Sequence, residues 1–314
     1  YLNFTPNYFS PKFVKTFGSP IKKLEQLTQD HYDLVASVQK VAEDVTISIL
    51  KNLHNKTRSS SLVVSGGFFM NSVLNGKILQ QTPYENIYIG ASPDDSGISV
   101  GSALYGLVYD KGFKNLRKRT LENYYGREFS NEEVLEELNK RKIKYQIVDE
   151  IESFAASKIK DKNIIGWFQG RSEFGQRALG NRSILADPTC VKIKDMVNSS
   201  IKYREGFRPF APSVIEEKQN DFFVNEENQT SFFMEKVLLF QEQVKESLGA
   251  VVHFDGSGRL QTVSSKINAR YHKLICEFEK ISGFPIILNT SFNINGMPLV
   301  ESPADAIDCF YKSG

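Results

Sequence analysis

The sequence contains little cysteine, and its cysteines are scattered. Among its 314 residues are three cysteines, Cys190, Cys276 and Cys309, with no paired spacing. That number and spacing argue against a disulfide framework and against a thiolate zinc site. Cys276 falls in an apolar periodic run, which indicates a core position rather than an activated thiolate.

The sequence also lacks an excess of charge of either sign and a long apolar run. Lys plus Arg number 39 and Asp plus Glu number 37, for a net charge of +2, which gives little general attraction to nucleic acid or membrane surfaces. No stretch approaches the ~20 apolar residues of a membrane span, and no signal peptide is visible. We therefore expect a cytoplasmic protein whose anion binding comes from local clusters. No motif decides between a monomer and a homodimer.

Hydrophobic periodicity predicts an α/β protein. A stripe with three- and four-residue steps predicts a long amphipathic helix and consists of Leu34, Val38, Val41, Val45 and Ile49. Apolar runs at residues 62–64 and 87–89 predict strands, each followed by a turn and a helix, at 71–80 and 98–108. Repeated strand, turn and helix indicate a sheet whose loops gather at one edge.

The alternation restarts beyond the basic stretch at residues 111–119, which is the candidate linker. Ser130 and Glu133 form a capping-box pattern at the start of a charged helix. Three further strands are predicted at residues 145–148, 164–168 and 285–288.

Two of the turns have compositions suited to a nucleotide. In the turn at residues 65–71, Gly66 and Gly67 let the backbone approach a phosphate, and the following helix start offers free N–H groups. The DDSG turn at residues 94–97 supplies a carboxylate that can hold a divalent cation. Each turn alone is equally explained by ordinary turn and capping chemistry. At one shared sheet edge, the two together predict a nucleotide site.

Arginine is concentrated among glycines between residues 170 and 212. The basic residues are Arg171, Arg177, Arg182, Lys202, Arg204 and Arg208. Guanidinium groups match phosphate and carboxylate oxygens and stay charged when desolvated, so we predict that these loops gather around a small anion. The alternative is a set of structural salt bridges to Glu173, Asp187 and Glu205. A later strand ends in amide and hydroxyl side chains that can orient a polar substrate or complete a turn.

Three segments together resemble the NodU/CmcH-type O-carbamoyltransferase family. The most specific is GWFQGRSEFGQRALGNRSI at residues 166–184, followed by KYREGFRPFAP at 202–212 and LNTSFN at 288–293. The segment DGSGRLQTV at 255–263 is similar to an arginine-containing loop of that family. Members join a domain like the threonylcarbamoyl-transfer protein Kae1 to one like the YrdC/Sua5 protein.

The resemblance implies a fold and a reaction. Residues 1–116 would be the carboxyl-terminal half of an actin-like (Kae1-like) ATP-binding domain, and residues 117–314 a YrdC-like α/β domain with a twisted mixed sheet. The substrates would be ATP and carbamoyl phosphate, which form carbamoyl adenylate. The carbamoyl group would then pass to a hydroxyl of a sugar or secondary-metabolite acceptor, with a divalent metal, usually iron, in the transfer domain.

The resemblance also implies roles for individual residues. Asp95 matches a metal ligand, and a cofactor-binding set comprises Gly66, Gly67, Asn71, Asn289 and Arg259. Lys202 with Arg204, and Ser291 with Asn293, are similar to the paired motifs of the adenylate-forming site. Arg171, Arg177, Arg182 and Arg208 are expected to bind carbamoyl-phosphate and nucleotide oxygens. Phe68 and Phe69 are bulkier than the residues usual in the glycine turn.

One departure from the family pattern stands out. The family holds its metal on two histidines four residues apart, but the histidines here are His31, His54, His253 and His272. We therefore expect a fragment that keeps the adenylate-forming domain, has half of the transfer domain, and lacks full transfer activity. A threonylcarbamoyl-type tRNA enzyme and a non-catalytic nucleotide-binding module are the alternatives.

Overall fold

The structure is a computed structural model that describes residues 9–21, 26–112 and 122–313. The chain divides into two compact units, Tyr1–Arg58 and Ser59–Gly314. The predicted linker lies mostly outside the described residues, as does the domain boundary predicted between residues 116 and 117, so that boundary stays a prediction.

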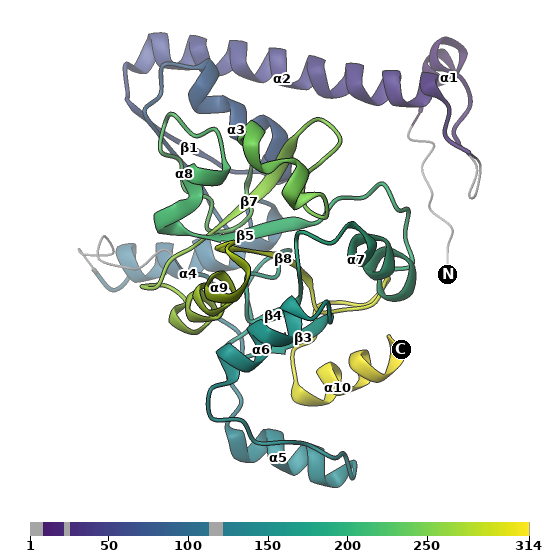
Figure 1. Cartoon of the computed structure of the whole chain (residues 1–314). Helices are drawn as coiled ribbons and strands as arrows, with labels where there is room; N and C mark the ends of the chain where they lie inside the picture. The colour runs from purple at the N-terminus through teal and green to yellow at the C-terminus, as the bar shows by residue number, and fades with distance from the viewer. Residues whose placement is uncertain (1–8, 22–25, 113–121, 314) are drawn as a thin grey trace. The chain divides into compact units, whose positions relative to one another are not determined.

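The first unit contains α1 (Pro11–Phe17) and the long helix α2 (Gln29–Thr57) (Figure 1). The helix predicted from the apolar stripe is confirmed. Its stripe is nevertheless largely exposed, at Val38, Val41, Val45 and Ile49, whereas the buried positions are Glu43, Ile47 and Leu50. The periodicity therefore identified the helix but not the face that is buried. No helix in the described part of the chain is both long and apolar enough to cross a membrane.

The second unit opens with two parallel strands, each followed by a 3-10 turn and a helix. Their order is β1 (Ser61–Val64), a 3-10 turn (Gly67–Met70), α3 (Ser72–Gln81), β2 (Asn86–Ile89), a 3-10 turn (Asp95–Gly97) and α4 (Ile98–Tyr109). The two strands pair in parallel, from Ser61 opposite Asn86 to Val64 opposite Ile89. The strand, turn and helix order predicted for this region is confirmed.

A six-stranded mixed sheet forms the rest of the second unit, with the strand order β3-β4-β8-β5-β7-β6. Its strands are β3 (Ile165–Phe168), β4 (Arg182–Ala186), β5 (Ala211–Ile215), β6 (Lys236–Leu239), β7 (Ser257–Val263) and β8 (Ile286–Ser291). Only β5 and β7 pair in parallel among these neighbours. The helices are α5 (Asn131–Lys140), α6 (Ile151–Lys160), α7 (Val191–Met196), α8 (Gln219–Phe222), α9 (Ala269–Ser282) and α10 (Pro303–Lys312). A mixed α/β fold is therefore confirmed.

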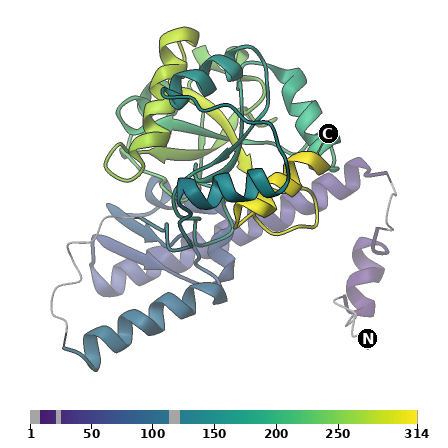
Figure 2. The same cartoon turned by 90° about the horizontal axis from the view of Figure 1, so that it is seen from below.

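Alternating side chains divide the core between the two faces of this sheet. On one face Leu185 and Ile287 pack with residues of α6 and α9, and on the other Ile184 and Leu288 pack with residues of α7 and α10. At the edge, α10 lies beside β3 and α5, as Figures 1 and 2 show. Both faces of the sheet are thus covered by helices and loops.

The face that carries α6 and α9 has a polar end. There Ser213, Gln261 and Asn289 form a buried hydrogen-bonded network, with 2.5 Å between Ser213 Oγ and Gln261 Oε1. Gln261 and Asn289 also donate to the backbone oxygens of Leu179 and Ala178, at 2.9 and 3.2 Å. The arginine-rich loop at residues 169–182 therefore covers this end of the sheet.

Two strand predictions need correction. Residues 145–148 form no strand: Tyr145 and Ile147 are exposed, and these residues pair with no strand in the described chain. The strand predicted at 285–288 continues to Ser291 because β4 pairs with its residues 288–291. Asn289 to Ser291 are therefore inside β8 rather than in a turn after it. The capping box of Ser130 and Glu133 at the start of α5 is confirmed.

Candidate functional site

The glycine turn and the aspartate turn lie side by side, as the sequence predicts. The Gly66 N–H and the Ser65 hydroxyl both donate to the Pro93 carbonyl oxygen, at 2.6 and 3.2 Å. Gly66 has φ of +106°, a conformation that side chains with a Cβ rarely adopt. The two turns therefore form one edge of the β1–β2 sheet.

Most polar side chains in these two turns are already bonded within the protein. The Asn71 side chain caps α3 by accepting from the Leu74 N–H at 3.1 Å. Asp94 accepts hydrogen bonds from Ser96, Gln176 and Ser92, which together hold the pKa of its carboxyl below the usual value. Capping and turn chemistry thus explain Asn71 and Asp94 without a ligand.

The arginine-rich loop is built around the buried Glu173 carboxylate. One of its oxygens accepts from the backbone N–H groups of Leu179, Asn181 and Arg182, at 2.7, 2.7 and 3.2 Å. Burial raises the pKa of Glu173, although these N–H groups act in the opposite direction. Glu173 therefore organises the backbone, and among the described residues it forms no ion pair with an arginine.

Arg182 is enclosed by backbone carbonyl oxygens. It is fully buried, and its guanidinium lies 3.6 Å above the Phe168 ring. It donates to the carbonyl oxygens of Gln169, Gly170 and Glu301, among others, at 2.6, 3.1 and 3.3 Å. Since its donors are engaged by carbonyls, Arg182 has a structural role, and the substrate contact expected of it stays a prediction.

Two other members of the predicted set are exposed to solvent, although the charge of Arg208 is close enough to Arg204 to lower its pKa. Arg208 is exposed and pairs with Glu205 at 2.8 Å, as the salt-bridge alternative predicts. Arg171 is exposed, and its backbone oxygen, not its guanidinium, is bonded to Asn181. Arg208 and Arg171 are therefore more exposed than the other predicted arginines, and their contact with a substrate stays a prediction.

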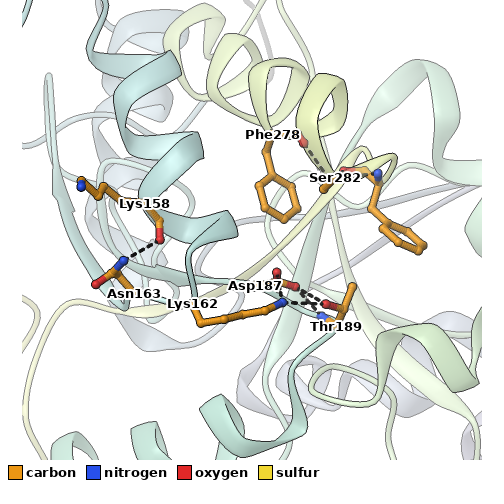
Figure 3. A network of polar contacts seen from close by, with 8 residues as sticks. Lys158, Lys162, Asn163, Asp187, Thr189, Phe278 and Ser282 are labelled. Carbon is orange, nitrogen blue, oxygen red and sulfur yellow. Dashed lines mark hydrogen bonds and ion pairs between the residues drawn. The ribbon is translucent and has the colours of Figure 1, made fainter.

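Asp187 is satisfied by a different cation. Figure 3 shows its carboxylate bonded to Lys162 and to the hydroxyl and N–H of Thr189. The Lys162 Nζ lies 2.5 Å from Asp187 Oδ2, and Asp187 is fully buried. The salt-bridge alternative is thus wrong for Asp187. This carboxylate pairs with Lys162, anchors the turn after β4 and neutralises none of the described arginines.

Four cations remain close together, and we call Arg177, Lys202, Arg204 and Arg259 the cationic cluster. Burial, with Arg177 and Arg204 as neighbouring charges, lowers the pKa of Arg259 to about 9. Burial likewise lowers the pKa of Arg177 and of Arg204. Within the described residues no carboxylate forms an ion pair with any of the four, and the buried Nε of Arg259 has no hydrogen-bond partner. Desolvated like charges without counter-ions are costly, and a bound anion would remove that cost.

Lys202 brings the two paired motifs together. Its Nζ lies 2.6 Å from the Ser291 carbonyl oxygen and 3.1 Å from the Ser291 hydroxyl. It lies 2.8 Å from the Asn293 carbonyl oxygen and 2.7 Å from Asn293 Oδ1. Burial and the neighbouring Arg204 lower the pKa of Lys202 to about 7. Because these oxygens engage its hydrogens, Lys202 contributes charge and positions Ser291 and Asn293.

The structure also places residues that sequence reasoning missed. Asn198, in the π-helical turn after α7, accepts from Arg204 Nε at 2.7 Å, and the Phe210 ring lies 4.8 Å from that guanidinium. Asn289 is 1% exposed and bonded inside the sheet network, so it supports the loop, and its predicted contact with a cofactor stays a prediction. No local sequence signal marks Asn198, because its partner lies six residues away around a turn.

Comparison with known families matches both parts of the chain. The family model described as "Carbamoyltransferase C-terminus" matches residues 156–314, more than half of the chain, and "Carbamoyltransferase N-terminus" matches residues 2–104. The chain belongs to the carbamoyltransferase family. The resemblance seen in the sequence is therefore confirmed, and the family is one of enzymes.

Several curated proteins are similar to this carbamoyltransferase chain. Nodulation protein NolNO of Sinorhizobium fredii is 42% identical over 90% of the chain and 42% of the relative's length. NolO of Bradyrhizobium diazoefficiens is 41% identical over 90% of the chain and 52% of its own length. Nodulation protein U of Rhizobium fredii is 32% identical over 81% of the chain and 42% of its own length. The chain spans about half the length of these relatives.

One solved structure shows a weaker likeness. It is full-length HypF in the phosphate- and nucleotide-bound form, with 14% identity and a TM-score of 0.38, covering 55% of this chain and 21% of that one. A likeness at that level supports no assignment of fold or function here.

The metal expected in the transfer domain needs several ligands close together. Asp95 is exposed, and its carboxylate forms no hydrogen bond or ion pair with another described residue. Across residues 9–21, 26–112 and 122–313, no group of three His, Cys, Asp or Glu side chains could hold a metal ion. The described residues thus offer one candidate ligand and do not by themselves form a metal site.

Proposed function

We propose that this chain forms carbamoyl adenylate from carbamoyl phosphate and ATP for O-carbamoylation of a hydroxyl-bearing small molecule. The observation that carries the proposal is the cationic cluster: four desolvated cations without carboxylate partners among the described residues, in a chain of the carbamoyltransferase family. Such an arrangement favours a compact, multiply charged anion.

The proposed chemistry has three balanced steps. Carbamoyl phosphate loses phosphate to water and gives carbamate. A carbamate oxygen then attacks the α-phosphorus of ATP, the P–O bond to the β-phosphate breaks, and pyrophosphate leaves. Finally the acceptor hydroxyl attacks the carbamoyl carbon, AMP leaves with the bonding electron pair, and the hydroxyl proton passes to the solvent.

The cationic cluster suits the second step. Negative charge accumulates on the departing pyrophosphate, and fixed guanidinium groups stabilise it without reorganising. Arg177, Arg204 and Arg259 would neutralise these oxygens, while Lys202 adds charge and holds Ser291 and Asn293. In this proposal residues 117–314 correspond to a YrdC-like domain and residues 1–116 to the carboxyl-terminal half of an actin-like, Kae1-like domain.

The proposal does not route a step through metal. Asp95 remains the candidate ligand that the resemblance implies, but the described residues supply no companion ligands. Acceptor choice belongs to the transfer step.

Carbamoyl-phosphate-dependent exchange of labelled pyrophosphate into ATP tests the proposal. We expect exchange that requires carbamoyl phosphate and falls to background in Arg177→Ala. ATP binding with no exchange would instead support a non-catalytic nucleotide-binding module. Exchange that requires threonine and bicarbonate would support a threonylcarbamoyl-type enzyme.

A further inference from the structure

The cationic cluster touches the aspartate turn through the residue next to Arg177. Gln176 Nε2 donates to Asp94 Oδ2 at 2.7 Å and lies 3.3 Å from the Ser92 hydroxyl. Residues 92 and 94 belong to the segment matched by the N-terminal family model, and residue 176 to the segment matched by the C-terminal one. This hydrogen bond therefore joins the two family segments across 82 residues of sequence.

The backbone of the arginine-rich loop also lies close to the aspartate turn at the preceding residue, Gly175. Gly175 has φ of +121°, and a Cβ added there would come within 2.7 Å of the Ala91 carbonyl oxygen. A side chain at this position would both strain the backbone and push the two loops apart. The contact between the loops is therefore made by the main chain as well as by Gln176.

The space between the loops is too small for a metabolite. A cavity of about 20 Å³, lined by Phe69, Pro93, Arg177 and Glu235 among others, lies between them. That volume holds roughly one water molecule. Any communication between the two loops must therefore pass through their direct contacts.

A continuous run of hydrogen bonds leads from Gln176 to the glycine turn. Asp94 also accepts from Ser92 and Ser96, at 2.9 and 2.7 Å, and so fixes the turn that carries Asp95. The neighbouring Pro93 oxygen accepts from Gly66 and Ser65. A displacement of residue 176 would thus reach both turns at the edge of the β1–β2 sheet.

We propose that Gln176 is a positioning residue that couples anion binding at the cationic cluster to the order of the Asp94–Gly97 turn. When an anion engages Arg177, the adjacent Gln176 is held in place, and its bond to Asp94 orders the turn. This rests on the proposed function only in requiring that the cluster binds a phosphate-type anion. Coupling is reciprocal, so a ligand at the aspartate turn would also tighten binding at the cluster.

Hydrogen exchange measured by mass spectrometry tests this coupling, with inorganic pyrophosphate as the probe. In the wild-type chain, pyrophosphate should slow exchange at residues 171–182 and also at residues 91–97, each by about fivefold or more. In Gln176→Leu, the slowing at 171–182 should persist while that at 91–97 disappears. A purely structural role would instead raise exchange at both segments before any ligand is added.

Matched variants isolate the hydrogen bond. Gln146→Leu makes the same replacement at an exposed glutamine of the 145–148 segment and should leave both protections unchanged. The double variant Gln176→Leu with Asp94→Ala should lose no more protection at 91–97 than Asp94→Ala alone. Either change by itself already removes the hydrogen bond between Gln176 and Asp94.

The outcomes separate the two proposals. Absence of protection at 171–182 in the wild type means that the cluster binds no pyrophosphate and overturns the proposed function. Protection at 171–182 without protection at 91–97, or equal protection at 91–97 in Gln176→Leu, overturns the coupling while leaving the anion site intact.

Discussion

The turns after β1 and β2 satisfy most of their own polar groups, whereas the guanidinium groups of Arg177 and Arg259 in the cationic cluster have no carboxylate partner among the described residues. Asn71 caps a helix and Asp94 accepts three side-chain hydrogen bonds. Arg177 and Arg259 are desolvated and have no carboxylate partner in the described chain. Fold stability explains the first region, but it does not explain the second, which costs free energy until an anion arrives.

The same contrast exists between individual arginines of one loop. Arg182 and Arg177 lie five residues apart in the segment that most resembles the carbamoyltransferase family. Arg182 is enclosed by carbonyl oxygens and an aromatic ring, while Arg177 has no such partners among the residues that the structure describes. Identical side chains therefore serve the fold at one position and the proposed ligand at the other.

The largest effect is expected from removing a guanidinium of the cluster. Arg177→Ala and Arg259→Met should each weaken pyrophosphate binding by about 100-fold or more, because charge-assisted bonds to phosphate are lost in a desolvated site. Without ligand, the melting temperature should stay the same or rise, since an unpaired charge is removed. Calorimetric titration and thermal melting check the two parts, and unfolding of both variants would assign these arginines to the fold.

The reverse result is expected at Arg182. Arg182→Met should lower the free energy of unfolding by about 3 kcal/mol, because several buried carbonyl oxygens lose their donor. Denaturant unfolding measures this loss. A variant as stable as the wild type but unable to bind pyrophosphate would reverse the assignment and place Arg182 in the site.

Lys202 should make anion binding depend on pH. Its pKa is about 7 in the free protein, and a bound anion raises it, so binding takes up a proton above that pH. Pyrophosphate affinity should consequently fall as the pH rises through 7, by at most about tenfold per unit from this group. Titrations from pH 6 to 9, corrected for ionisation of pyrophosphate, should show a flatter profile in Lys202→Met. An unchanged profile in that variant would exclude Lys202 as the titrating group.

The smallest effects of substitution are expected at side chains whose polar groups are already bonded within the protein. Asn71→Ala should destabilise the fold by about 1 kcal/mol through loss of the α3 cap and leave pyrophosphate affinity unchanged. Arg208→Ala should cost less than about 0.5 kcal/mol, since its pair with Glu205 is exposed. Unfolding curves and titrations of both variants check these limits. A tenfold loss of pyrophosphate affinity in either variant would contradict the distinction between these groups and the cationic cluster.

Much of the fold could be predicted from local pattern. The glycine turn, the helix at residues 98–108 and the capping box of Ser130 and Glu133 depend on neighbouring residues, and each was confirmed. The prediction of a strand at 145–148 was wrong. Alternation of apolar and polar residues indicates which side chains of a strand share a face, but it does not show whether another strand is available to pair with it. The exposed stripe of α2 shows the same limit for a helix.

The site could be predicted only as a set of residue types. Sequence indicated that arginines would gather, but not which of them the carbonyl oxygens would satisfy, because the partners of Arg182 come from residues as distant as Glu301. The contact of Lys202 with Ser291 and Asn293 was suggested by the family resemblance and spans about 90 residues. The bond between Gln176 and Asp94 had no sequence signal, since each residue is ordinary in its own turn.

Equilibrium titration of the ligand-free chain with inorganic pyrophosphate tests the anion site most directly. We expect one pyrophosphate per chain, an affinity that decreases with added salt, and a rise in melting temperature on binding. No binding by a chain that melts cooperatively would contradict the account, because the desolvated guanidinium groups would then exist without the anion that their arrangement requires.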